Sequence, residues 1–383
     1  MSALVHFNAA AAGLPLRPVV DRVIEHLERE AVDGAMEAAR AVTGELEALY
    51  ASAARLLGCG VDEVAVMESH TRGWQLAFAG FRFAAGDRIL TARSEWAGNY
   101  AALLRAAEHA GATVEVVPSD DSGQVSIPAL EAMLDPRVKL IALTWLPANG
   151  GLINPAQEVG RVARAAGIPF VLDAAQAIGQ VPIDVAALGC DVLTASGRKY
   201  LRGPRGTGVL YVRRGFAEQL VPPPLDHVSA PRSPDGRFVQ RLDARRYEAG
   251  ETSVALRLGL GVAIDHALAI GLPALRAQIA SNASQLRAAL ADVRGLVLRD
   301  LGVERSGLVS FTIDGIACEA IRVALAARRI NVAVNGVAYT PLDMTARGLD
   351  QIVRASVHAD TTRADIAHLV HALHELCDER RVR

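Results

Sequence analysis

The chain has 383 residues, of which 51% are hydrophobic, and its formal net charge at pH 7 is -2. This length and apolar content allow a large domain and a smaller one with a sizeable core. The small net charge, with arginines interleaved among carboxylates, excludes an electrostatic surface that would gather nucleic acid or an anionic membrane.

The N-terminal stretch MSALVHFNAAAAGLPLR lacks the basic start and the long apolar core of a signal peptide. No apolar stretch of membrane-spanning length is free of proline, asparagine or charge. These features predict a cytoplasmic protein that binds neither a membrane nor nucleic acid. Residues 16–55, which include PVVDRVIEHLERE, predict a helical arm.

Between about residues 60 and 215, short β-rich runs alternate with helical patterns. The series starts with VAVME and TRGWQLAFAGF and ends with PFVLDA, DVLTAS and GVLYVRR. Such alternation predicts a mostly parallel sheet covered by helices on both faces. The strands are too apolar to be half-exposed.

The remaining third of the chain begins with VPPPLDHVSAPRSPDGRF, residues 221–238, a proline-rich stretch of the kind that often covers a site. A long helical pattern then starts near Val254 and continues into LPALRAQIASNASQLRAALADV. Strands and helices alternate after it, with helices around 317–328 and 362–378. This order predicts a small α+β domain.

Only two lysines, Lys139 and Lys199, occur among the 40 basic residues. A primary amine can form an imine with an aldehyde, whereas a guanidinium cannot. Lys199, in TASGRKYLRGPRGTG, is therefore a candidate anchor for pyridoxal 5'-phosphate (PLP). The alternative is an ordinary exposed charge, which we expect of Lys139 at the mouth of a strand.

Asp173 closes the apolar strand IPFVLDA, and ligands of open α/β sheets lie at the carboxyl ends of strands. There it could pair with the protonated ring nitrogen of PLP and keep the ring an electron sink. The alternative is a helix N-cap. Gln176 could turn its amide toward the phenolic oxygen of the cofactor.

A phosphate needs backbone N–H groups, hydroxyls and cations. His70 and Thr71 stand where a strand passes into a helix, and a helix N-terminus offers free donors and a positive dipole. Ser196 and Arg198 could reach the same phosphate from across the ring. Each of the four could instead be a helix cap or a surface charge. GPRGTG lacks the GK[ST] ending and precedes a strand, so we reject a nucleotide loop.

The four cysteines, Cys59, Cys190, Cys318 and Cys377, show no metal-ligand spacing. We therefore expect neither a zinc site nor a disulfide framework. Cys190 and Cys318 are expected to be buried small apolar residues.

The chain resembles the class V aminotransferase family of fold-type I PLP enzymes, which includes cysteine desulfurases, isopenicillin N epimerase-like proteins and hercynylcysteine sulfoxide lyases. The likeness spans nearly the whole chain. Its motifs occur in the expected order: FNAAAAG, ESHTRG, SEWAGN, TWLPANGGLINP, VLDAAQAIGQ, SGRKYLRGPRGTG, RRYEAGE and VRASVHADTT.

The resemblance implies an α/β fold with a large, mostly parallel seven-stranded sheet between helices and a smaller C-terminal α+β domain. We expect an N-terminal arm that contributes to the small domain (1–15), a large PLP-binding domain (16–250) and the small domain (251–383). A homodimer is expected, because in this fold the cofactor usually lies near the subunit boundary.

The resemblance also implies a role for individual residues. Lys199 corresponds to the lysine that binds PLP covalently, and Arg354 to the arginine that grips the substrate carboxylate. The other positions contact the cofactor: Asp173 at the ring nitrogen, Gln176 and Asn149 at the phenolic oxygen, Trp96 stacked on the ring, and His70, Thr71, Ser196 and Arg198 at the phosphate. Asn149 is also expected to contact the substrate.

Two departures from the family pattern bear on the reaction. Desulfurases carry a cysteine on a mobile loop, but the corresponding stretch NVAVNGVAYTPLDMTARGLDQIV contains none. Without a thiolate to accept sulfur, desulfuration is disfavoured. The family often has a threonine after EAG that reaches the phosphate of the partner subunit. Here Glu251 stands at that position with Thr252 next, so the resemblance makes Thr252 the candidate for this cofactor contact.

We therefore expect a PLP enzyme that acts on an amino acid. β-Elimination is favoured: cleavage of the C–S bond of a cysteine conjugate or its sulfoxide, with release of pyruvate and ammonia. Transamination and epimerisation remain alternatives. A non-enzymatic regulator is disfavoured because Lys199, Asp173 and Arg354 are all present.

Overall fold

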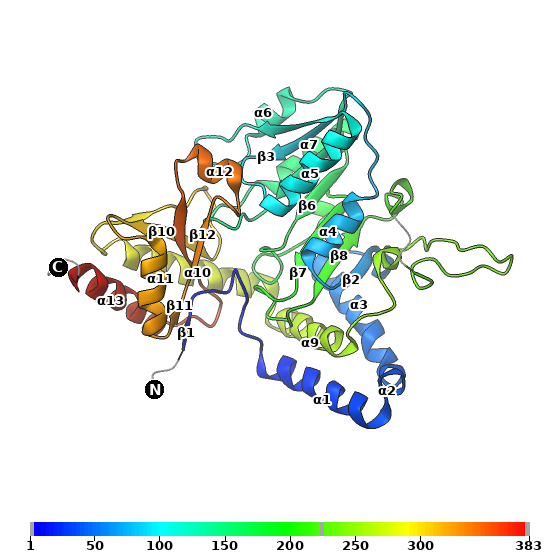
Figure 1. The fold of residues 1–383 in the computed structure, drawn as a ribbon, viewed down its shortest axis with the longest axis horizontal. Coiled ribbons are helices and arrows are strands. Elements are labelled where there is room, and N and C mark those ends of the chain that lie inside the picture. Colours follow the sequence, from blue (N-terminus) through cyan, green and yellow to red (C-terminus); the bar gives the residue numbers. More distant parts are fainter. Residues whose placement is uncertain (1–3, 223–225, 380–383) are drawn as a thin grey trace.

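The computed structural model describes residues 4–222 and 226–379, and a seven-stranded sheet forms the centre of its larger part (Figure 1). The strand order is β2–β8–β7–β6–β5–β3–β4. Neighbouring strands run parallel except where β8 pairs with β2 and β7. The mostly parallel sheet predicted from the alternating pattern is therefore confirmed. The strands span Val64–Met67 (β2), Arg88–Ala92 (β3), Thr113–Val117 (β4), Val138–Thr144 (β5), Phe170–Asp173 (β6), Val192–Ser196 (β7) and Gly208–Val212 (β8).

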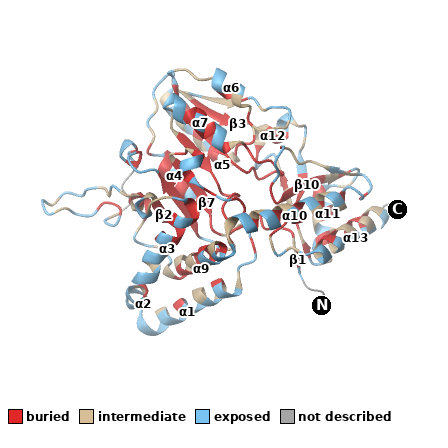
Figure 2. Cartoon of the chain, turned by 180° about the vertical axis from the view of Figure 1, so that it is seen from behind, coloured by how far each residue is buried: buried red, intermediate tan, exposed pale blue. Residues whose placement is uncertain are grey.

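Both faces of this sheet are buried, which explains why its strands are continuous apolar runs. In β6, Leu172 packs in the core on one face, while its neighbour Val171 packs in the core on the other. Figure 2 shows the buried residues concentrated along these strands. One core takes residues from α3 (Thr43–Leu57), α6 (Ile127–Ala132), α7 (Ala156–Ala166) and α8 (Val185–Leu188), and the other from α4 (His70–Phe78) and α5 (Ala97–Ala110).

The smaller part is built on an antiparallel sheet in the order β12–β13–β10–β9. The N-terminal strand β1 (Val5–His6) pairs in parallel with β11 (Ile330–Asn331), and Phe7 is buried in the core of this part. The first residues of the chain thus belong to the small domain in space. Its other elements are β9 (Leu296–Leu298), β10 (Leu308–Ile313), β12 (Ala333–Gly336), β13 (Gln351–Ser356), α10 (Leu272–Leu290), α11 (Cys318–Ala327), α12 (Pro341–Ala346) and α13 (Arg363–Glu379).

The sequence predicted one long helical stretch from Val254, but the structure contains two helices here. α9 (Val254–Ile270) ends at Gly271, whose φ of +88° ends the helix, and α10 continues at an angle of 83° to it. Leu260 and Ile264 of α9 pack in the core of the large sheet. We therefore propose that the domain boundary lies near Gly271, rather than at the predicted residue 251.

Two further helices, α1 (Arg17–Asp33) and α2 (Ala35–Ala41), follow the N-terminal arm, and α1 packs against α9. No single helix in the described ranges is long and apolar enough to cross a membrane. Only the bent pair α9 and α10, taken together, reaches the required length and composition.

Residues 226–238 of the proline-rich stretch extend away from the body of the molecule as a long loop (Figure 1). Residues 223–225 of this stretch lie outside the described residues. None of its described residues lines the cavity presented below. Within one chain, the structure therefore does not bear out the expectation that this stretch covers the site.

Candidate active site

A cavity of about 620 Å³ opens where β5, β6 and β7 end. Because these strands are parallel, their last residues Thr144, Asp173 and Ser196 meet at one edge of the sheet, and all three line the cavity. The small domain and the N-terminal arm complete the wall with residues 333–335 and 10–12. The site therefore lies between the two domains.

Lys199 follows β7 in a turn and lines this cavity. Burial lowers the pKa of its amine to about 7, although the charge of Asp173 opposes the effect. No hydrogen bond or ion pair engages its Nζ among the described residues. An amine that is neutral near pH 7 and has no partner is able to react with an aldehyde. Lys139, by contrast, is exposed and donates to the carbonyl of Pro136.

Asp173 is 4% exposed and has three polar partners. His70 Nε2 lies 2.9 Å and the Ala175 N–H 2.8 Å from its Oδ1, and Asn99 Nδ2 donates to Oδ2 at 2.8 Å. Burial alone would raise the pKa of this carboxyl, but His70 and the Ala175 N–H hold it below its ordinary value. The residue is therefore a fixed buried anion at the cavity wall.

A polar network behind Asp173 was not foreseen from the sequence. Glu95 is 1% exposed, and burial raises the pKa of its carboxyl. One of its donors is Asn99, whose amide also holds Asp173. Glu95 thereby fixes the orientation of the Asn99 amide. The full set of donors to Glu95 is Thr91 Oγ1, Trp96 N, Asn99 Nδ2, Thr144 N and Thr144 Oγ1.

Hydroxyls and cations gather at the N-terminus of α4. Ser69 caps this helix by accepting from Arg72 N, and Thr71 lines the cavity beside it. Gly208 allows β8 to lie close to the start of α4, because a Cβ at this position would lie 2.8 Å from the backbone nitrogen of His70. Ser196, Arg198, Arg205 and Thr207 complete this end of the cavity. From the sequence, GPRGTG was considered only as a nucleotide loop, which was rejected, so Arg205 and Thr207 were missed.

Arg354 of β13 reaches the cavity from the small domain. It is 3% exposed, and burial lowers the pKa of its guanidinium to about 10. Its Nη1 donates to the Ala148 carbonyl at 2.9 Å, while its Nε is buried without a partner among the described residues. A buried guanidinium with spare donors is suited to a carboxylate.

Trp96 and Tyr339 form an aromatic pair at the cavity, with ring centroids 5.6 Å apart and planes at 44°. The small domain supplies Tyr339, which was not foreseen. Asn149, in contrast, is not among the lining residues. Its amide donates to Gly336 O and Thr340 Oγ1. In this structure Asn149 therefore connects the segment that follows β5 to the small domain.

Three other expected contacts point elsewhere in this structure. Gln176 lines the cavity, but its Nε2 donates to Ala10 O, which leaves Oε1 buried without a partner among the described residues. Arg198 lines the cavity but donates to Ala11 O. His70 lines the cavity, and its Nε2 pairs with Asp173.

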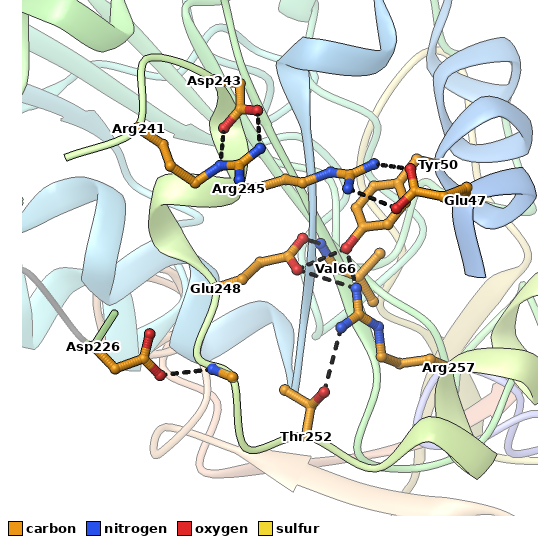
Figure 3. Close-up of polar contacts among 11 residues, drawn as sticks. Glu47, Tyr50, Val66, Asp226, Arg241, Asp243, Arg245, Glu248, Thr252 and Arg257 are labelled. Carbon is orange, nitrogen blue, oxygen red and sulfur yellow. Dashed lines mark hydrogen bonds and ion pairs between the residues drawn. The ribbon is translucent and has the colours of Figure 1, made fainter. Parts of the chain in front are cut away.

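Thr252 lies outside the cavity, in the network shown in Figure 3. Arg257 Nη1 donates to Thr252 Oγ1 at 3.3 Å and its Nη2 pairs with Glu248, which also accepts from Tyr50 and from Val66 N in β2. Within one chain, Thr252 does not reach the cofactor site. A contact across a homodimer stays a prediction.

The donor set fits PLP. The cavity brings together an unpartnered amine for the aldehyde, a buried anion for the ring nitrogen and a cationic, hydroxyl-rich end at a helix N-terminus for the phosphate. No group of three or more residues that could hold a metal ion occurs among the residues described. All four cysteines are described, and none lines the cavity.

Comparisons with known proteins agree with this geometry. A family model described as aminotransferase class-V matches residues 5–369. A probable hercynylcysteine sulfoxide lyase of Mycobacterium tuberculosis (strain CDC 1551 / Oshkosh) is 31% identical over 373 residues, which cover 96% of this chain and 89% of the relative.

Two solved structures are similar along nearly their whole length. The apo structure of a cysteine desulfurase from Thermococcus onnurineus NA1 has a TM-score of 0.90 and 25% identity, and covers 98% of this chain and 95% of that one. A variant of C-DES, solved with glycine covalently linked to its PLP cofactor, has a TM-score of 0.88 and 21% identity over 98% and 97% of the chains. The predicted fold is confirmed.

Proposed function

Because the chain belongs to the class V aminotransferase family, a family of PLP-dependent enzymes, we propose that it cleaves the C–S bond of a cysteine conjugate or its sulfoxide by β-elimination. One observation carries the choice of reaction. The cavity contains a free lysine amine and a buried arginine, but no cysteine that could accept sulfur. The similarity to a probable sulfoxide lyase supports the same choice.

Arg354, Asp173 and Lys199 have separate roles in this reaction. Arg354 holds the substrate carboxylate with its spare donors, and the anion Asp173 keeps the ring nitrogen of the cofactor protonated. Bound PLP supplies the electron sink that makes the α-proton acidic. The Lys199 amine takes that proton and is placed to return it to the departing thiolate or sulfenate. The remaining three-carbon fragment, which still carries the amino group, reacts with water to give pyruvate and ammonia.

The decisive assay supplies S-substituted cysteines and their sulfoxides to the holoenzyme without any keto acid. We expect pyruvate and ammonia in equal amounts, together with the sulfur-containing leaving group. Turnover only when a keto acid is added would assign an aminotransferase, and inversion of the substrate without pyruvate would assign an epimerase.

Desulfuration is the second candidate, because a cysteine desulfurase is among the similar solved structures. It is separable by product: a desulfurase converts free cysteine to alanine, whereas β-elimination gives pyruvate. Alanine as the product from cysteine would overturn the proposed lyase. The absence of a cysteine from the cavity is the reason we expect pyruvate.

We expect Arg354→Ala to lower kcat/KM by about 30-fold to several thousand-fold, since removing one partner of a buried charge pair costs about 2–5 kcal/mol. The loss should fall mainly on KM. Arg363→Ala, which removes an exposed arginine at the start of α13, is the matched control. An S-substituted cysteamine, which has no carboxylate, should react equally poorly with both variants. Unchanged KM for cysteine conjugates in the Arg354 variant would contradict its assignment.

The rate should depend on pH through Lys199. Its pKa, lowered to about 7 by burial, means that the amine is a neutral base above pH 7 and a protonated, inactive group below it. We expect kcat to rise as pH increases through about 7 and to be roughly tenfold lower at pH 6 than on the plateau. A profile flat from pH 5.5 to 8.5 would argue against Lys199 as the base.

A further inference from the structure

The turn that carries Lys199 is anchored in the small domain by the next residue. Tyr200 is 2% exposed, and its ring packs in the small-domain core with Ile279 and Leu308. Its carbonyl faces His358 Nε2 at 2.9 Å, and the two rings lie 5.9 Å apart with planes at 21°. A residue of the large domain's catalytic turn is thus held from the small domain.

His358 stands between two acceptors. Its Nε2 faces the Tyr200 carbonyl, and its Nδ1 lies 3.4 Å from Asp360 Oδ1. A carbonyl and a carboxylate can only accept, so both present oxygen atoms toward the ring nitrogens of His358. His358 holds the pKa of Asp360 down to about 2. The small pocket beside them also contains His6, whose Nε2 faces Ala12 O instead.

The other end of the turn is held by Arg202. Its N–H donates to the Lys199 carbonyl at 3.0 Å, and its φ is +62°, in the left-handed region that long side chains seldom adopt. Two contacts of the guanidinium keep it there: Nη1 lies 2.9 Å from Asp360 Oδ2, and Nε donates to Leu14 O at 2.7 Å. Backbone held in such a conformation by its surroundings is common at functional sites.

The N-terminal arm closes over the same turn. Gly13 donates its N–H to Arg198 O at 2.9 Å, and a Cβ at Gly13 would lie 2.5 Å from the Lys199 carbonyl oxygen. His358, meanwhile, lies two residues beyond the end of β13, the strand that carries Arg354 into the cavity. The groups proposed to bind the substrate carboxylate and to hold the lysine turn are therefore four residues apart on one segment.

We propose that His358, together with Asp360 and Arg202, is a positioning residue for Lys199. By holding the turn at Tyr200 and at Arg202, it keeps the lysine amine in its desolvated position beside Asp173. The inference rests on Lys199 as the PLP anchor, but not on which bond the enzyme cleaves. The proposal gives His358 and Asp360, which stand in the motif VRASVHADTT, a role in supporting the active site.

The pKa of the Lys199 amine shows how firmly the turn is held. Burial lowers its pKa to about 7, Asp173 opposes this effect, and the charges of Arg198 and Arg354 add to it. If the turn loosens, water reaches the amine and the effect of burial weakens. The pKa of Lys199 should then rise toward that of a solvated lysine.

The test follows the rate at which the full-length chain, freed of its cofactor, forms the covalent linkage with added PLP between pH 5.5 and 10. The visible absorbance of the linkage reports the rate, so no substrate is needed. For the wild type we expect a midpoint near 7. For His358→Phe, which keeps a ring but loses both ring nitrogens, we expect the midpoint to rise by about one unit, which is roughly a fivefold loss of neutral amine at pH 7.

Two further variants isolate the cause. His358→Gln keeps a donor for the Tyr200 carbonyl, and its midpoint should stay near that of the wild type. His371→Phe makes the same replacement at an exposed histidine of α13 and should change nothing.

A wild-type midpoint in folded His358→Phe would overturn the inference. If that variant does not fold, Asp360→Ala takes its place, because Asp360 is largely exposed and its loss weakens the same contacts. A smaller upward shift is expected there, and no shift would overturn the inference. A wild-type chain that forms no linkage with PLP at all would instead contradict the assignment of Lys199 itself.

Discussion

Replacing Lys199 with alanine is expected to abolish the visible absorbance of the holoenzyme and to lower kcat by at least about 10⁴-fold, the upper end of the contribution of a general base. The variant loses both the covalent linkage to PLP and the group that takes the α-proton. The cavity offers no other amine that could bind PLP. Its arginines cannot form an imine with the cofactor, and guanidiniums do not act as bases near neutral pH. These arginines are Arg198, Arg205 and Arg354.

Lys139→Ala is the matched control, because these are the two lysines of the chain. Lys139 is exposed, lies on β5 and donates only to a backbone carbonyl. The control should keep the absorbance band and full activity. A band that survives in Lys199→Ala and disappears in Lys139→Ala would reverse the assignment.

Asp173→Asn is expected to lower kcat by about 10³-fold, on the scale of losing one fixed electrostatic contact in a closed site. Asparagine has nearly the same shape but no charge, so the ring nitrogen of PLP would lose the anion that keeps it protonated. The amide would also present N–H groups to the Ala175 and Asn99 groups that now donate to the carboxylate, and its loss of charge would remove the pairing with His70. Binding of PLP should weaken as well.

The control for Asp173 is Asp191→Asn. Asp191 precedes β7, at the opposite edge of the same sheet, where it accepts from Phe170 N and Arg213. Its loss should lower the melting temperature without changing kcat for the cofactor-saturated enzyme. An Asp173 variant that retains kcat within about threefold at saturating PLP would remove the ring-nitrogen role from the account.

Much of the fold followed from local pattern. Apolar runs separated by amphipathic helices can form little else than a parallel sheet buried on both faces. Because parallel strands end at one edge, the same pattern placed Asp173 and Ser196 together and Lys199 close behind them. The break between α9 and α10 was missed because Gly271 sits inside an otherwise continuous helical pattern.

The rest of the site depends on contacts between distant segments. Glu95 and Asn99 lie four residues apart around the start of α5, which is a local signal, but their connection to Asp173 exists only in three dimensions. Because the small domain folds against the large one, Tyr339 reaches the cavity and His358 reaches the turn that carries Lys199. Asn149, at a family position, and Thr252, next to one, were expected to contact the cofactor, yet their side chains are engaged elsewhere within this chain.

The most direct test of the central claim is to find the atom that binds the cofactor. Holoenzyme reduced with borohydride fixes PLP to its lysine, and peptide mass spectrometry then distinguishes the segment around position 199 from that around 139. We predict the whole label on Lys199, with none on Lys139. Label on Lys139, or no label on protein that carries bound PLP, would contradict the account.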